Sequence, residues 1–330
     1  SESITGPEPS RMRCFASRGA GRERLRPRRG TAAYPARAYH RGMTRRRPGE
    51  RLSAARLYLR SLEGGALAAR HSSGARTRTA HLLGFLSPLH EAAATALGPE
   101  GEVTLLVANH RDWHLVCSYP YGLPFTRNLP STSVVIAAAD YPERLKRRFD
   151  DLLLAAGKAG AAPGPVSEFL DLLVGHEWGH AVANRSGLRT GVKWLDELMA
   201  TYLLVAGLLA TGGEEAHALL ERWTRVQVAA TADLKGALDE FEYPRGRMEL
   251  AKLLWFQGVF TERALALAPA RGFDLALELR AALSRDEGAP APDRGDVARA
   301  LVEVEPSFRP WFAVFGEDPA QAGVTGVSLS

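Results

Sequence analysis

The chain has 330 residues, of which 45% are hydrophobic and 24% are charged, a composition typical of a soluble globular protein with a sizeable core. Its formal net charge is +5, but residues 1–50 hold thirteen Arg, no Lys and four Glu, which is +9, so residues 51–330 carry −4. Because this larger part is mildly acidic, its charge gives no argument for specific nucleic-acid binding.

Residues 1–50 are rich in Arg, Gly and Pro and poor in apolar residues, so they bury too little surface to offset the entropy of ordering. We expect a disordered tail. Three interpretations stay open: a polyelectrolyte arm for RNA or lipid, a transit-type segment, or an extension outside the natural product. The Gly and Pro residues argue against the amphipathic helix of a transit segment, and Met43 could be a natural start.

The elements expected in residues 51–330 fall into two parts of a single α+β domain. Apolar residues have helical spacing in residues 51–70 and 85–97, although Gly64 and Gly65 interrupt the first stretch. Strands are then expected at residues 101–109, 114–120 (a weaker run) and 131–140, so residues 51–160 form the sheet-containing part. Residues 161–330 are predicted to be mostly helical. Expected helices from Pro142 onward are residues 142–156, 165–185, 193–211, 214–230, 246–268 and 272–284.

No secretory or membrane signal is visible in the sequence. The most apolar run, Leu198 to Thr211, is too short to span a bilayer and fits a buried helix. Cys14 and Cys117 are the only cysteines, so neither a disulfide framework nor a cysteine metal site is expected. The sequence therefore predicts a cytoplasmic protein in a reducing compartment, without a membrane span.

The segment HEWGH, residues 176–180, matches the pattern H-E-x-x-H. On a helix, His176 and His180 lie on one face, one turn apart, and can direct both imidazoles to one point. Glu177 lies beside that face, where it can accept a proton from a water on a Zn²⁺ ion. The alternative is a pair of hydrogen-bonded histidines that only pack, because a five-residue pattern also arises by chance.

A third ligand is available on the next predicted helix. Glu197 follows His180 by 17 residues, and an antiparallel return helix would bring its carboxylate back to the histidines. It begins the most apolar helix of the chain, where an unpaired carboxylate is costly. The other interpretation is an acidic residue in the first helical turn that favours the helix dipole, a role that Asp196 partly fits.

The residues HEWGHAVAN, then SGL, then WLDELMA resemble the gluzincin metallopeptidases, the thermolysin-like and aminopeptidase N-like enzymes. His180 continues into Ala-Val as in thermolysin-like enzymes, and Glu197 matches their glutamate ligand, with the small residue Ala200 three positions later. The strand before the motif, residues 133–140, looks like the edge strand that aligns substrate in such enzymes. The resemblance covers about 30 residues strongly and implies a zincin-like fold.

The sequence departs from these families at two points. The segment from Asn184 to Glu197 is slightly shorter, and Thr201 stands where they carry an aspartate that orients a histidine. Metzincins are excluded, because their motif needs Gly at position 183 and His at position 186, where this chain has Ala183 and Ser186.

The resemblance implies a peptide or protein substrate and one Zn²⁺ ion held by His176, His180 and Glu197. Zinc lowers the pKa of its water toward about 7, and Glu177 is expected to act as general base and then to protonate the leaving amine. A further donor must stabilise the oxyanion, and related enzymes use a downstream tyrosine or histidine. Tyr243 is our first candidate, followed by Tyr202 and His217.

Three rival functions stay open alongside a zinc metallopeptidase. They are an inactive binding protein of the same fold, a zinc hydrolase that does not cleave peptides, and a scaffold for a functional basic tail.

Overall fold

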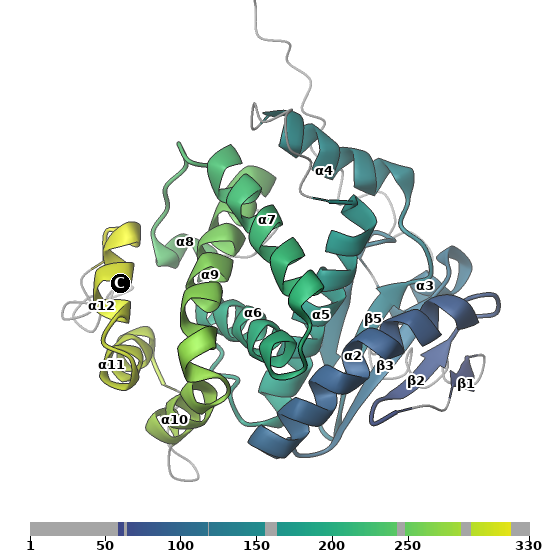
Figure 1. Cartoon of the computed structure of the whole chain (residues 1–330), viewed down its shortest axis with the longest axis horizontal. Helices are drawn as coiled ribbons and strands as arrows, with labels where there is room; N and C mark the ends of the chain where they lie inside the picture. The colour runs from purple at the N-terminus through teal and green to yellow at the C-terminus, as the bar shows by residue number, and fades with distance from the viewer. Residues whose placement is uncertain are drawn as a thin grey trace, which may run out of the picture. The chain divides into compact units, whose positions relative to one another are not determined.

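The computed structural model describes residues 59–62, 65–117, 119–155, 164–242, 248–284 and 292–317. They belong to one unit of the chain, Arg46–Ser330. The Arg-rich segment 1–50 and Tyr243 lie outside the described residues, so the domain boundary at residue 50 stays a prediction. The structure is a mixed α/β fold with a five-stranded sheet in the first half, as predicted, but helices α2 and α3 lie between its strands in the chain and mostly helical structure follows (Figure 1).

The sheet has the strand order β1-β2-β3-β5-β4. The three inner strands β2, β3 and β5 are parallel, whereas β1 and β4 pair antiparallel with β2 and β5. The edge strand β4 therefore runs against its neighbour. The strand bounds are β1 Arg60–Leu62, β2 Ala68–His71, β3 Glu102–Ala108, β4 Phe125–Asn128 and β5 Thr132–Ala138.

The two central strands are apolar on both faces because helices or loops cover both faces of the sheet. One face, with Leu105 of β3 and Val135 of β5, joins the main core. The opposite face, with Leu106 and Ile136, packs against Trp113 in a smaller core. A strand that is buried on both faces has a continuous run of aliphatic residues. This pattern made it possible to predict β3 and β5 from the sequence.

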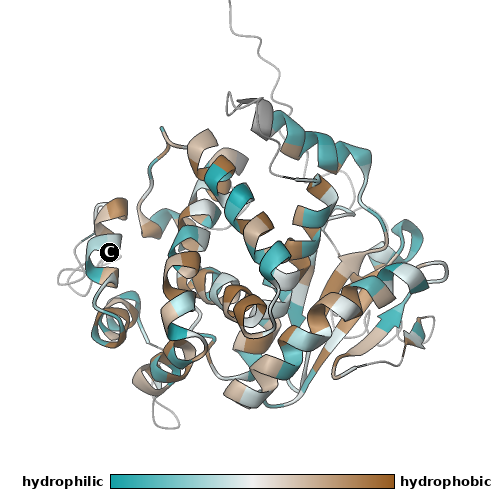
Figure 2. Ribbon diagram, in the orientation of Figure 1, coloured by the Kyte–Doolittle hydropathy of each residue, from teal (hydrophilic) through white to brown (hydrophobic). Residues whose placement is uncertain are grey.

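The helices surround the apolar helix α6, Lys193–Ala210, which is buried at every position from Trp194 to Leu208 except Asp196. Helices α2, α5, α7, α8 and α9 all contact it. Hydrophobic residues are concentrated on α6 and the central strands, whereas α4 is mostly hydrophilic (Figure 2). The other helices are α2 Arg76–Leu97, α3 His110–Val116, α4 Glu143–Ala155, α5 Val166–Arg185, α7 Glu214–Ala230, α8 Leu238–Glu242, α9 Leu250–Arg271, α10 Asp274–Leu283, α11 Arg294–Val304 and α12 Phe308–Phe312.

Among the described residues, no helix combines the length and the apolar character needed to cross a membrane. The apolar run Leu198 to Thr211 lies in the buried helix α6, as predicted.

Two predicted elements are wrong. The described residues of the expected helix 51–70 form strands β1 and β2, because β2 pairs in parallel with β3 and this pairing outweighs the helical spacing of Leu and Ala. The weak strand expected at 114–120 overlaps α3 instead. Asn109 caps that helix, since its side-chain oxygen accepts a hydrogen bond from the Asp112 amide at 3.0 Å.

The identity of the edge strand is also corrected. Residues 133–140 were expected to form the edge strand, but β5 lies inside the sheet between β3 and β4. The edge is β4, which lies between Pro124 and Pro130. Both prolines fall outside the four residues of the strand, where a missing N–H breaks no ladder bond.

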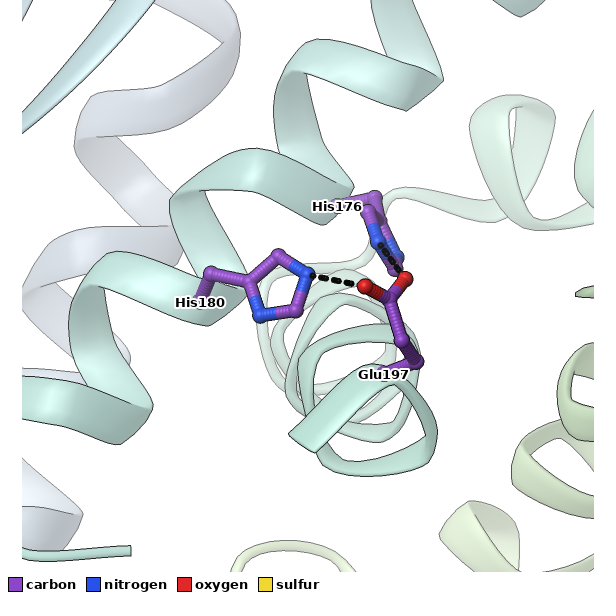
Figure 3. A group of neighbouring side chains, drawn as sticks. All are labelled: His176, His180 and Glu197. Carbon is purple, nitrogen blue, oxygen red and sulfur yellow. Dashed lines mark hydrogen bonds and ion pairs between the residues drawn. The ribbon is translucent and has the colours of Figure 1, made fainter. Parts of the chain in front are cut away.

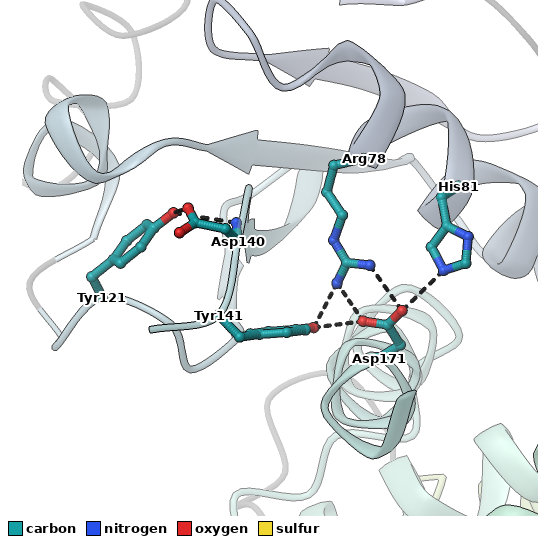
Figure 4. A network of polar contacts seen from close by, with 6 residues as sticks. All are labelled: Arg78, His81, Tyr121, Asp140, Tyr141 and Asp171. Atoms are coloured by element: carbon teal, nitrogen blue, oxygen red, sulfur yellow. Dashed lines mark hydrogen bonds and ion pairs between the residues drawn. The ribbon is translucent and has the colours of Figure 1, made fainter. Parts of the chain in front are cut away.

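A polar network joins α2, α5 and the residues after β5 (Figure 4). Asp171 of α5 accepts two hydrogen bonds from the Arg78 guanidinium, one of them 2.8 Å long, and one of 2.7 Å from the Tyr141 hydroxyl. His81 approaches the second carboxylate oxygen at 2.9 Å. Burial by itself would raise the pKa of Asp171, but the hydrogen bonds and charge of Arg78, together with the hydrogen bonds of Tyr141 and His81, outweigh it and lower this pKa.

Substitution of Asp171 by Asn is expected to lower the free energy of unfolding at neutral pH by about 2–3 kcal/mol. This is less than the roughly 3–5 kcal/mol of a fully buried pair, because the Arg78 and Asp171 side chains keep 19% and 15% exposure. A lowered native pKa stabilises the fold above the ordinary value of 3.8, and this stability is lost as pH falls below it. Denaturant unfolding from about pH 6 to pH 2 measures both effects.

In that experiment the wild type should lose stability in acid more steeply than Asp171→Asn. Glu168→Gln, an exposed change on the same helix, is the control. Parallel curves for the wild type and Asp171→Asn would show that this network does not carry the acid sensitivity.

Candidate metal centre

Two glycines of the motif helix α5 allow α6 to pack unusually close to it. A Cβ atom added at Gly179 would lie 2.1 Å from the carbonyl oxygen of Ala200, and one added at Gly175 would lie 2.7 Å from a methyl carbon of Leu204. The Gly179 contact is with backbone, so a side chain there would push the two helices apart. The glycine inside HEWGH therefore sets the distance between the two helices that carry the predicted site.

The structure brings His176, His180 and Glu197 together (Figure 3). The Nε2 atom of His176 lies 3.2 Å from Oε2 of Glu197, and Nε2 of His180 lies 3.5 Å from Oε1. One donor atom from each residue falls within 4.8 Å of the others. The Glu197 residue is only 3% exposed, whereas both histidines are partly exposed.

Each histidine nitrogen lies from a Glu197 oxygen at about the separation of two ligands of a small tetrahedral cation. Zinc–nitrogen and zinc–oxygen bonds are about 2.0–2.2 Å long, so two ligands of a tetrahedral ion are about 3.4 Å apart. The 3.2 Å distance from His176 Nε2 to Oε2 and the 3.5 Å distance from His180 Nε2 to Oε1 are close to this value, each to a different oxygen of Glu197. Two imidazoles and one carboxylate are also a donor set that zinc takes in catalytic sites, where a fourth position stays open.

Thr201, which stands where the gluzincin families carry an aspartate, contacts the first histidine. Its hydroxyl lies 3.2 Å from the carbonyl oxygen of Glu197, to which it donates, and 2.9 Å from Nδ1 of His176. Because the single hydroxyl proton is used by that carbonyl, the threonine oxygen accepts from Nδ1–H of His176. This tautomer leaves the lone pair on Nε2, the atom that faces Glu197.

Glu177 lies beside the triad on the side of strand β4. Its backbone carbonyl accepts a 2.5 Å hydrogen bond from the Thr126 hydroxyl, which ties β4 to the motif helix. Burial raises the pKa of the Cys117 thiol, and the charge of Glu177 adds to this increase. The Glu177 carboxylate is therefore within electrostatic reach of Cys117, at the end of α3.

Asp196, the alternative to Glu197, has another role in the structure. Its carboxylate accepts hydrogen bonds of 3.0 Å from the Thr190 amide and 3.3 Å from the Thr190 hydroxyl. These bonds hold the turn before α6. Burial raises the pKa of Asp196, and these hydrogen bonds partly oppose the increase. Asp196 therefore orients the connection between the two helices, and Glu197 is the acid that meets the histidines.

The candidates for oxyanion stabilisation are not assembled with the triad in the described residues. Tyr243 lies outside them, although the preceding residue, Glu242, accepts a 3.2 Å hydrogen bond from the Trp194 amide at the start of α6. The Tyr202 hydroxyl is directed elsewhere and donates to the Gly272 carbonyl at 2.5 Å. His217 approaches Glu221 of its own helix at 3.8 Å.

His110 and His114 are exposed, and Trp223, Trp255 and Trp311 are buried in the core.

One contact to the triad was missed in the sequence. Gln257 of α9 donates a 2.7 Å hydrogen bond from its amide to Oε2 of Glu197. The available signal was a lone polar residue in the apolar segment LLWFQGVF. Its partner was not predictable, because α9 lies 60 residues away in sequence.

A cavity of about 620 Å³ lies among α2, α5 and α7 and is not part of this centre. Its lining includes His81, Asp171 and Glu214 but none of the triad. On α5, Asp171 is on the face opposite the two motif histidines, since the five residues to His176 and the nine to His180 turn the helix by about 140° and 180°.

Comparisons of this chain with protein families, curated proteins and solved structures find no match.

Proposed function

We propose that this protein is a zinc-dependent peptidase with a zincin-like catalytic domain. The observation that carries the proposal is the convergence of His176, His180 and Glu197 within 4.8 Å, with Glu177 next to the first histidine. Two imidazoles and a nearly buried carboxylate that face one point supply the nitrogen and oxygen ligands that a Zn²⁺ ion takes. The resemblance of the motif to gluzincins supports the same class.

A bound Zn²⁺ ion would supply Lewis acidity and a water of lowered pKa. The protein's own residues would do the remaining work. Glu177 would take up the proton of the attacking water and pass it to the leaving amine, a role that its place beside the ligand face allows. Thr201 would hold His176 in the tautomer that presents Nε2.

Strand β4 would align the substrate. It is the last strand of the sheet at this end, and Thr126 connects it to the carbonyl of Glu177. An extended peptide that pairs with its outer edge would pass next to the triad. This favours a peptide over a compact small molecule as substrate, and so favours a peptidase over other zinc hydrolases.

The test is metal content together with peptide cleavage. Purified full-length protein, stripped with a chelator and dialysed against Zn²⁺, should retain about one zinc ion per chain, as in catalytic sites with three protein ligands. The zinc-loaded protein should cleave peptides in a mixed library read by mass spectrometry, and the stripped protein should not. Failure to bind zinc would refute the proposal, whereas stoichiometric zinc without cleavage would refute the peptidase and favour an inactive binding protein.

A further inference from the structure

Helix α9 reaches into the candidate metal centre through one side chain. The Gln257 amide donates to Oε2 of Glu197 at 2.7 Å, and the same oxygen faces His176 at 3.2 Å. The other oxygen, Oε1, faces His180 at 3.5 Å. The two carboxylate oxygens therefore have different surroundings, and only Oε2 receives the Gln257 amide.

We propose that Gln257 is a positioning residue that keeps Glu197 a ligand through one oxygen and so preserves an open coordination position; this rests on the proposed zinc site. A hydrogen bond to Oε2 fixes the rotation of the carboxylate and directs electron density of Oε2 toward the amide. Oε1 is then the better metal ligand. Bidentate coordination would occupy the position that hydrolysis needs for water.

The amide is suited to this role because it is neutral. A lysine or arginine at position 257 would neutralise the Glu197 carboxylate and compete with the cation for it. Glutamine supplies a donor and leaves the negative charge available to the metal.

Close packing fixes the position of α9 in this region. At Gly258 an added Cβ would lie 2.9 Å from a methyl group of Val228 on α7, so α9 and α7 are in tight contact beside Gln257. The Gln257 carbonyl also accepts a 2.7 Å hydrogen bond from the Thr261 hydroxyl. The Gln257 side-chain amide therefore extends from a part of α9 whose backbone is held in place by packing against α7.

Gln257→Leu tests the proposal, with Gln227→Leu as the matched control. Gln227 is also half-buried, and its amide donates a 2.7 Å bond to the Leu254 carbonyl of the same helix α9, away from the triad. Zinc affinity is measured by competition with a chromogenic chelator. The coordination number is read from the visible absorption of the Co²⁺-substituted protein, which is stronger for four-coordinate than for five-coordinate cobalt.

Gln257→Leu should bind zinc roughly 10–100-fold more weakly, the usual cost of removing a hydrogen-bond partner of a ligand. Its cobalt bands should weaken toward those of a five-coordinate ion. Gln227→Leu should lose comparable thermal stability but keep wild-type affinity and bands. If Gln257→Leu unfolds in the assay, Gln257→Met, closer in length, is measured in the same way.

The outcomes separate this proposal from the proposed function. Wild-type affinity and cobalt bands in the Gln257 variant would overturn the positioning role while leaving the zinc site intact. Equal losses in both variants would also overturn it, because they would show a general effect of loosening α9. Absence of zinc from the wild-type protein would overturn the site itself.

Discussion

Replacing Glu197 by Ala is expected to empty the metal centre. The carboxylate is the only anionic group of the triad, and it faces both imidazoles at 3.2 and 3.5 Å. Apparent zinc-binding free energies of about 10–16 kcal/mol are shared among three or four ligands, so losing one should weaken binding on the order of 10²–10³-fold. Dialysis against a fixed Zn²⁺ concentration, followed by elemental analysis, measures the loss.

Asp196→Ala is the matched control for this experiment. It removes the neighbouring acid, whose carboxylate accepts hydrogen bonds from Thr190 and interacts with His180 only through charge. It should lower stability by disturbing the turn before α6, while zinc occupancy of the folded protein stays near that of the wild type. If the Asp196 variant lost zinc and the Glu197 variant kept it, the assignment of the third ligand would be wrong.

The candidate site was predictable because its main information is local. Spacing of four on a helix places His176 and His180 on one face, and the connection between α5 and α6 is short enough to return Glu197, near the start of α6, to them. The residues that complete the environment of the triad depend on tertiary packing. Thr126 comes from an edge strand and Gln257 from a helix much later in the chain, so no periodicity or short motif connects them to α5.

The fold was predictable where one face or all sides of an element are buried. Strands β3 and β5 and the apolar helix α6 carry that signal directly in their aliphatic residues. Strands β1, β2 and β4 are three or four residues long and lie at or near the sheet edges, so their sequences are not clearly apolar or alternating. Pairing with neighbours decides their structure, and pairing is not visible in a short stretch of sequence.

Gly179 has no side chain that could bind a metal or react, but it sets the distance between α5 and α6, the helices that carry the candidate site. Its missing side chain lets the Ala200 carbonyl approach, and Ala200 stands one turn after Glu197 on the same helix. The second variable position of H-E-x-x-H, Gly179, is therefore restricted to glycine in this chain by the packing of α6 against α5. The same close approach places the Thr201 hydroxyl at 2.9 Å from His176.

Glu177→Gln is expected to leave the metal in place and to remove most of the peptide cleavage. The amide has nearly the same shape but accepts no proton, so kcat should fall about 10²–10⁴-fold, the usual contribution of a general base. Zinc occupancy should stay at the wild-type level, because Glu177 is not among the three residues that meet. KM should change little, since the backbone carbonyl of Glu177 that Thr126 contacts is retained.

Steady-state cleavage of one peptide substrate, with zinc content determined on the same samples, gives both quantities. Glu168→Gln makes the same chemical change at an exposed position nine residues earlier on α5 and should cleave like the wild type. A Glu177 variant that holds zinc and cleaves at the wild-type rate would assign the proton transfer to another group. Loss of zinc from this variant would instead show that Glu177 supports the metal centre, which the contacts of the triad do not predict.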